Sequence, residues 1–250
     1  KLDKKRVVEL TIVGKKVVIS TDNKDENQII IQGKDYGLNY IKVLQGLYRA
    51  GYQEIKIKDP IKINEIIQIL EKKLIGYEII EHKKDSITIR DITNESEEEF
   101  AVILRRIFLL MLEYEAMEGE MARSLDRNIK KLINYAQRIL IQKGHSEYKK
   151  TPIYYLMLDR IEKLSDEFKW CLIEGKKTKK FKEIIGLLRE AYEVYYKFDP
   201  KKYDKAQYRS YELKNEIKLE KNVNKQTIHL HNLARILNSL FGDLFVLKIE

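Results

Sequence analysis

The sequence predicts an α+β protein in which a small N-terminal α/β domain precedes an elongated all-α helical bundle. Up to about residue 94, short β-branched runs alternate with stretches of helical spacing, whereas from residue 95 onward apolar residues recur only at helical spacing. A chain of 250 residues, 44% of them hydrophobic, is long enough for two cores, and 3 prolines and 11 glycines leave little room for long irregular loops. We therefore expect a short strand segment over 1–20, the α/β domain over 21–94 and the helical bundle over 95–250.

The N-terminal part begins with a hairpin pattern. Two β-branched runs, 7–12 and 16–20, flank Gly14, and 28–31 is a third strand candidate. The later elements are a helix over 38–48 with Gly51 at its end, a strand over 54–58, a helix over 63–74 after Pro60, and a closing hairpin of 77–82 and 86–91. This succession is typical of a small α/β domain.

The C-terminal part is a series of helices joined by short links. Ser96 with Glu99 is typical of a capping box, and helical spacing then continues from residue 100 to 141, either as one helix or as two broken near Gly119. The next helix is expected over 151–175, with Thr151 as N-cap and Pro152 at the first helical position. Three more are expected: over 178–197, from Asp199-Pro200 to a break at 222–224, and over 227–245. Counting the first pattern as one helix, the sequence predicts a bundle of five antiparallel helices.

Positive charge is concentrated in one stretch of the chain. The formal net charge is +9, and residues 176–225 alone carry 15 basic and 8 acidic residues, a net charge of +7. The pattern fits either a solvated surface or an anion-binding face that includes Lys176, Lys177, Lys179, Lys180 and Lys182. Tyrosines accompany these lysines and fit either base stacking or packing between helices: Tyr192, Tyr195, Tyr196, Tyr203, Tyr208 and Tyr211. A nucleic-acid-binding protein that uses this Lys/Tyr-rich helical surface is therefore one candidate function.

Several other classes of protein are disfavoured. A single cysteine, Cys171, and 4 histidines exclude a disulfide framework and a cysteine-based zinc site. No apolar run approaches the ~18 residues of a membrane span, so we expect a cytoplasmic protein without membrane insertion. Nucleophile elbows, phosphate-binding glycine loops and HExxH motifs are absent from the sequence, so we do not expect an enzyme.

One constellation of acids could bind a metal. Asp159, Glu162 and Asp166 are spaced i, i+3, i+7 and lie along one stripe of a helix. An apolar stripe runs beside them, and the small Ser165 would let another helix approach closely. In helical bundles such carboxylates bind hard or di-iron-type cations, but solvated acids with this spacing are also common.

Four segments together resemble a known family. They are residues 161–166 (IEKLSD), 74–81 (LIGYEIIE), 89–91 (IRD) and 104–110 (LRRIFLL). The first is similar to the Glu-x-x-x-Asp signature of the phosphate-uptake regulator (PhoU) family. The others resemble archaeal members in which an AbrB-like DNA-binding segment and an α/β insert precede the PhoU helices. Residues 2–10 look like the second half of an AbrB-like hairpin, so that 1–20 would be a partial AbrB-like segment.

The resemblance implies a regulator of phosphate uptake that folds as paired three-helix bundles. Such a protein would act through a phosphate transporter ATPase or a signalling kinase, as a homodimer, with DNA binding through an AbrB-like segment. The acid pair at Glu162 and Asp166 would hold iron or zinc.

Two features depart from the family pattern. Residues 230–236 (LHNLARI) take the place of a second signature helix, but His231 and Arg235 replace its acid pair. An arginine there would repel a cation, and we expect it to pair with acids across the bundle. The five helices counted above also fall short of the family's six. A metal-free structural interaction bundle is therefore the third candidate.

Overall fold

The computed structural model describes residues 8–13, 16–21, 27–36, 39–93, 100–218 and 223–249. The chain divides into two compact units, residues 1–95 and 96–250, which are considered separately below. The expected capping box of Ser96 and Glu99, the helix start at 38, the helix break at 222 and the first residues of the AbrB-like segment lie outside the described residues.

The first unit opens with a two-stranded antiparallel sheet. Its strands are β1 (Val8–Val13) and β2 (Lys16–Thr21), and their register pairs Val8 with Thr21 and Val13 with Lys16. The expected strand pairing is therefore present. Its AbrB-like character stays a prediction.

A four-stranded mixed sheet forms the rest of this unit. Its strands are β3 (Gln28–Gln32), β4 (Glu54–Lys58), β5 (Tyr77–His82) and β6 (Ser86–Asp91), in the order β3-β4-β6-β5. β3 and β4 are parallel, and the other two pairs are antiparallel. All four strands were expected, within one residue at each end.

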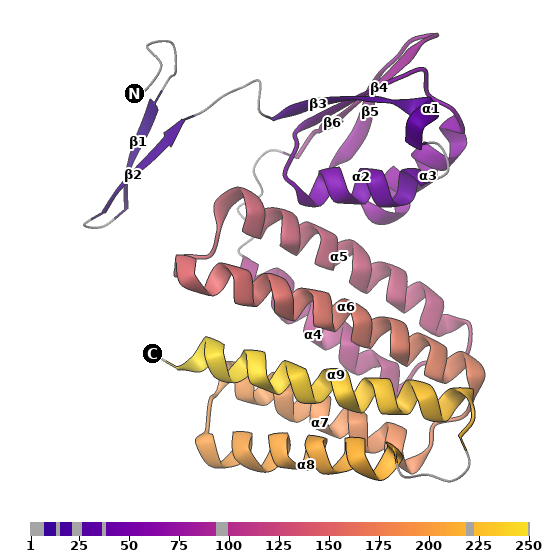
Figure 1. Ribbon diagram of the computed structural model, residues 1–250, viewed down its shortest axis with the longest axis vertical. Coiled ribbons are helices and arrows are strands. Elements are labelled where there is room, and N and C mark those ends of the chain that lie inside the picture. The colour runs from indigo at the N-terminus through magenta and orange to yellow at the C-terminus, as the bar shows by residue number, and fades with distance from the viewer. Residues whose placement is uncertain are drawn as a thin grey trace. The chain divides into compact units, whose positions relative to one another are not determined.

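Two helices cover one face of this sheet. α2 (Tyr40–Arg49) and α3 (Ile63–Lys73) lie on the same side (Figure 1), and a helical turn, α1 (Gly33–Tyr36), follows β3. The core between sheet and helices includes Ile55, Ile57, Ile87, Ile89 and Leu44, all fully buried. The chain approaches itself closely at Gly33, where an added Cβ would lie 2.5 Å from the backbone oxygen of Asp59.

The second unit is a bundle of helices, as expected. Its long members are α4 (Phe100–Leu112), α5 (Met121–Lys143), α6 (Thr151–Glu174), α7 (Lys179–Tyr196), α8 (Pro200–Lys218) and α9 (Lys225–Lys248). Residues 100–143 thus form two helices, which corrects the count of five to six within the described residues. A 3-10 turn, η1 (Glu113–Glu115), ends α4, and Gly119 has a left-handed φ of 45° before α5 begins.

Polar side chains cap three of these helices. Thr178 accepts a hydrogen bond from the backbone N–H of Phe181, Asp199 accepts from two N–H groups at the start of α8, and Asn224 accepts from the N–H of Thr227. Thr151 was expected to be a cap as well, but this was wrong. It is the first residue of α6, preceded by the 3-10 turn η2 (Tyr148–Lys150), and its hydroxyl accepts from the N–H of His145.

The six helices form two similar halves, α4–α6 and α7–α9. α6 and α9 are antiparallel and make the most extensive contact between the halves (Figure 1). Buried positions repeat at the same spacing: 122, 126, 129 and 133 on α5 match 206, 210, 213 and 217 on α8, and 161, 164, 165 and 168 on α6 match 230, 233, 234 and 237 on α9. In this alignment Asp126 corresponds to Ser210 and Asp166 to Arg235.

Candidate functional site

The three acids of the expected metal site lie on α6, and two of them pair with lysines. The Asp166 Oδ1 atom accepts hydrogen bonds from Lys130 Nζ at 2.6 Å and from Lys169 Nζ at 2.5 Å. Asp159 accepts from Lys163 Nζ at 2.6 Å, one helical turn away on α6. Glu162, between the two aspartates, also has an interaction partner.

Asp166 belongs to a polar contact between α5 and α6 that we call the first seam, formed by Asp126, Lys130, Asp166 and Lys169. Asp126 Oδ2 lies 3.0 Å from Lys169 Nζ and 3.2 Å from Lys130 Nζ. Both lysines therefore bridge the same two aspartates. The seam contains two carboxylates and two ammonium groups.

A buried hydrogen-bond chain anchors the first seam to η1. Ser165 Oγ donates to Asp126 Oδ1 at 2.9 Å, and Tyr114 Oη lies 2.8 Å from Ser165 Oγ. Because the serine proton is directed to the carboxylate, the tyrosine must donate in the second bond. Ser165 was expected to admit a neighbouring helix, and it is fully buried.

The electrostatics of the first seam favour the charged pairs. Burial alone would raise the pKa of Asp166, but hydrogen bonds from Lys130 and Lys169 hold that pKa below its usual range. Burial likewise opposes a charged Lys130, but its bond to Asp166 and the charge of Asp126 raise the Lys130 pKa. Burial raises the pKa of the Tyr114 hydroxyl, which therefore remains a donor.

This arrangement does not fit a metal ion at Asp166 as it stands. Two ammonium groups already occupy its Oδ1 atom, and a cation would be repelled until both withdrew. Among the described residues, no three or more His, Cys, Asp or Glu side chains are placed to share a metal ion. The expectation of iron or zinc at Asp159, Glu162 and Asp166 stays a prediction.

The equivalent contact in the other half lies between α8 and α9, and we call it the second seam. It is formed by Ser210, Lys214, Lys218, His231, Arg235 and Asn238. Asn238 Oδ1 lies 3.1 Å from Ser210 Oγ and accepts a hydrogen bond from Gln207 Nε2 at 3.4 Å, which shows how the two helices align. Lys214 and Arg235 follow one helical turn from this contact, and Lys218 and His231 follow two turns away.

The second seam differs from the first in charge. Arg235 was expected to pair with acids across the bundle, but in the part of the chain that the structure describes no carboxylate contacts it. Burial and the charges of Arg235, Lys218 and Lys214 lower the pKa of His231. The neighbouring acid on α6, Glu167, is engaged elsewhere, by His229 at 2.6 Å and by Asn232 at 3.1 Å.

The lysine run proposed as an anion-binding face lies at the junction of α6 and α7. Lys176 and Lys177 belong to the link between the helices, whereas Lys179, Lys180 and Lys182 lie in the first turns of α7. The backbone oxygen of Lys176 accepts a hydrogen bond from the Gln226 side chain at 2.6 Å, which ties this link to α9.

The tyrosines of this region fall into two groups. Tyr192, Tyr195 and Tyr203 pack against aromatic rings of other helices. Tyr196 instead contacts the rings of Tyr192 and Tyr195 on its own helix and exposes 46% of its surface, and Tyr208 and Tyr211 on α8 expose 59% and 47%. Interhelical packing therefore accounts for the first three, and the three exposed tyrosines are open to a stacking ligand.

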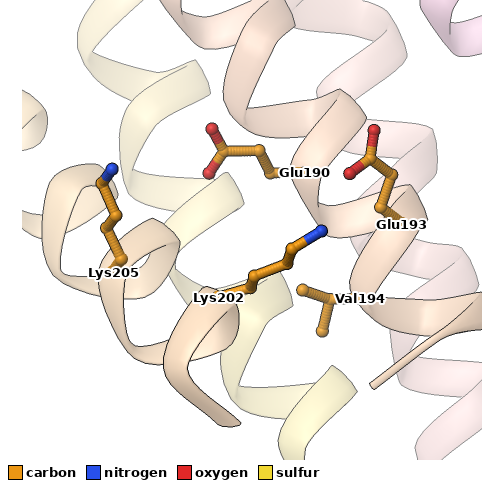
Figure 2. A pocket seen from close by; sticks show the side chains of 5 residues that line it. All are labelled: Glu190, Glu193, Val194, Lys202 and Lys205. Carbon is orange, nitrogen blue, oxygen red and sulfur yellow. The ribbon is translucent and has the colours of Figure 1, made fainter. Parts of the chain in front are cut away.

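A small pocket lies between α7 and α8. Figure 2 shows its lining, which consists of Glu190, Glu193, Val194, Lys202 and Lys205. Its volume is about 190 Å³, below the roughly 300–1,000 Å³ that is typical of sites for small organic ligands. The pocket therefore does not favour a substrate site.

Sequence reasoning missed most of the partners in both seams. Asp126, Lys130 and Lys169 carry the usual i, i+3 and i, i+4 spacings of paired charges, but so do many solvated helix faces. Lys214 and Lys218 gave no signal beyond the general basicity of this stretch.

Comparison of the chain with protein-family models, with curated protein sequences and with solved structures gave no match. Among the described helices, none combines the length and the apolar character that crossing a bilayer requires.

Proposed function

We propose that the chain is a non-enzymatic regulator of phosphate uptake that acts by docking to a phosphate transporter ATPase or to a signalling kinase. The observation that carries this proposal is the duplicated arrangement of α4–α6 and α7–α9. Paired three-helix bundles are what the resemblance to the PhoU family implies. The sixth helix, obtained by the break at Gly119, removes one of the two departures from that pattern.

The second departure remains and gives the proposed regulator a particular form. His231 and Arg235 leave no acid pair on α9, so a second metal site is not part of the proposal. We add from the resemblance alone that the chain acts as a homodimer and that an AbrB-like segment binds DNA.

The test is an affinity capture from lysate of the native host grown at high and at low phosphate. The tagged chain is the bait, and excess untagged chain is the competitor that defines specific recovery. Recovery of a phosphate transporter ATPase or its signalling kinase, changing with phosphate and lost on competition, is the expected result. Recovery that is the same at both phosphate levels would refute the regulatory role.

Metal binding is implied by the resemblance alone, against the lysine contacts of Asp166, and has its own test. Metal analysis of protein purified without chelator would compare the unmodified chain with Asp166→Ala. Iron or zinc that is lost in the variant would support the site at Asp159, Glu162 and Asp166. Equal and negligible metal in both would leave a metal-free interaction bundle.

A nucleic-acid-binding function is the second candidate, and the exposed Tyr208 and Tyr211 favour it. Lys214 Nζ lies 4.5 Å from the centre of the Tyr211 ring, so a base stacked there would meet a cation. Phosphate-driven binding weakens steeply with salt. Charge reversal at Lys176, Lys177, Lys179 and Lys180 should then abolish binding to duplex DNA, and affinity that is flat in salt would exclude this function.

A further inference from the structure

The two halves of the bundle carry different charges at equivalent positions. In the first seam, Lys130 and Lys169 are balanced by Asp126 and Asp166. In the second seam Lys214 keeps the charge of Lys130, Asn238 stands in place of Lys169, and Ser210 and Arg235 replace the two aspartates. Glu167, on the neighbouring helix α6, is held by His229 and Asn232.

The cations of the second seam lie within about two helical turns of one contact between α8 and α9, and Lys218 and Arg235 are exposed. The Asn238–Ser210 contact sets the alignment, and the helices run antiparallel from it. With a rise of about 1.5 Å per residue, Lys214 and Arg235 lie ~5 Å along the axis from that contact, and Lys218 and His231 lie roughly 11 Å along. Lysine side chains are long and flexible enough for both ammonium groups to reach a ligand held beside Arg235.

Among the residues that the structure describes, no carboxylate neutralises these cations. In the described residues, Lys214, Lys218 and Arg235 form no ion pair. Lys214 lies over the Tyr211 ring, but a cation–π contact leaves its charge in place. Burial, and then the charges of Arg235, Lys218 and Lys214, lower the pKa of His231, which lies on the same stretch of α9 as Arg235.

We propose that the second seam binds a small tetrahedral oxyanion, such as inorganic phosphate or sulfate, through Arg235, Lys214 and Lys218. A guanidinium presents two parallel N–H donors to such an anion, and the ammonium groups supply charge-assisted hydrogen bonds to its other oxygens. His231, neutral at pH 7.5, supplies one further N–H donor. A bound dianion would also offset the electrostatic repulsion among Arg235, Lys214 and Lys218 in the free protein.

The experiment is a calorimetric titration of the full chain at pH 7.5 with phosphate, sulfate or chloride at constant ionic strength. We expect saturable binding of phosphate and sulfate and none of chloride. Arg235→Gln should weaken binding at least tenfold, since a charge-assisted bidentate contact is lost. Lys214→Gln should weaken it by a similar factor and provides a second variant should the first fail to fold.

Lys205→Gln is the matched control, because Lys205 is an exposed lysine of the same helix outside the seam. It should leave the affinity within twofold of the unmodified chain. Absence of saturable binding, or equal weakening in Lys205→Gln and Arg235→Gln, would overturn the proposal. Binding is measured on purified protein, so its failure would leave the proposed docking role standing, and failure of the affinity capture would leave the anion site standing.

Discussion

Replacing Lys169 with methionine tests whether the first seam stabilises the bundle. The ammonium group lies 3.0 Å from Asp126 Oδ2 and 2.5 Å from Asp166 Oδ1, and the side chains of Lys169 and Asp126 are only 10% and 7% exposed. Removing one partner of a buried ion pair costs about 3–5 kcal/mol. Because Lys130 still contacts both aspartates and Asp166 is 41% exposed, we expect the lower value of about 2–3 kcal/mol.

The measurement is urea unfolding followed by the fluorescence of Trp170, the single tryptophan of the chain, which lies on α6. Lys163→Met is the matched control, since Lys163 pairs on the same helix with Asp159 but both side chains are exposed, by 61% and 38%. The control should lose at most about 0.5 kcal/mol. Equal losses in Lys169→Met and Lys163→Met would refute a buried charge cluster.

A double-mutant cycle sharpens the same test. Asp126→Asn combined with Lys169→Met should cost about 1–2 kcal/mol less than the sum of the two single changes, because the partners are in contact. Strict additivity would show that the two side chains do not interact in solution, whatever each contributes alone.

Four further outcomes follow from the structure. Tyr114→Phe should lower the free energy of unfolding by about 1 kcal/mol through loss of its bond to Ser165, whereas no change in urea unfolding would mean that this bond is not made. Gly33→Ala should destabilise the first unit by about 2 kcal/mol, since the new Cβ meets backbone, and a thermal melt by circular dichroism with an unchanged midpoint would contradict the close approach. Burial raises the pKa of Cys171 to about 12, so this thiol should resist a disulfide reagent at pH 8 until the protein is unfolded, and rapid labelling of native protein would contradict its burial. The pKa of Asp166 is lowered on folding, so the stability that its ionised form contributes is present above the ordinary carboxyl pKa of 3.8 and is lost as the pH falls below that value. Asp166→Asn should therefore make the free energy of unfolding less dependent on pH in the acid range, and parallel pH curves for the two proteins would exclude this linkage.

The apolar patterns predicted the fold well because a helix face depends on local spacing. Ile161, Leu164, Phe168 and Cys171 were assigned to one stripe, and all four are fully buried. The strand over 54–58 followed in the same way from the alternation of Ile55 and Ile57 with polar residues, and both isoleucines are fully buried. Periodicity could not decide the break near Gly119, because helical spacing continues on both sides of a short interruption in which α4 ends at Leu112, η1 follows and Gly119 adopts a left-handed φ.

Local signals were less reliable where tertiary contacts intervene. Thr151 before a proline has the sequence of an N-cap, but its hydroxyl accepts from the His145 N–H and the helix begins one residue earlier than expected. Asp166 stood out as a carboxylate in a stripe, but its two lysine partners could not be identified from spacing alone. Lys130 lies on another helix, and Lys169 joins α6 to α5 through its second hydrogen bond, to Asp126. The seams are therefore properties of the packing.

The repeated packing of α4–α6 and α7–α9 affects how a partner protein can approach the bundle. A scaffold with true two-fold symmetry presents the same face after half a rotation, so a partner could approach it in two equivalent ways. Here the first seam pairs its two lysines with two aspartates, whereas Lys214, Lys218 and Arg235 of the second seam form no ion pair among the described residues. This difference in charge makes the two approaches unequal for a charged partner, because electrostatic attraction acts before any contact forms. The repeated packing of the two halves is therefore combined with charges that distinguish them.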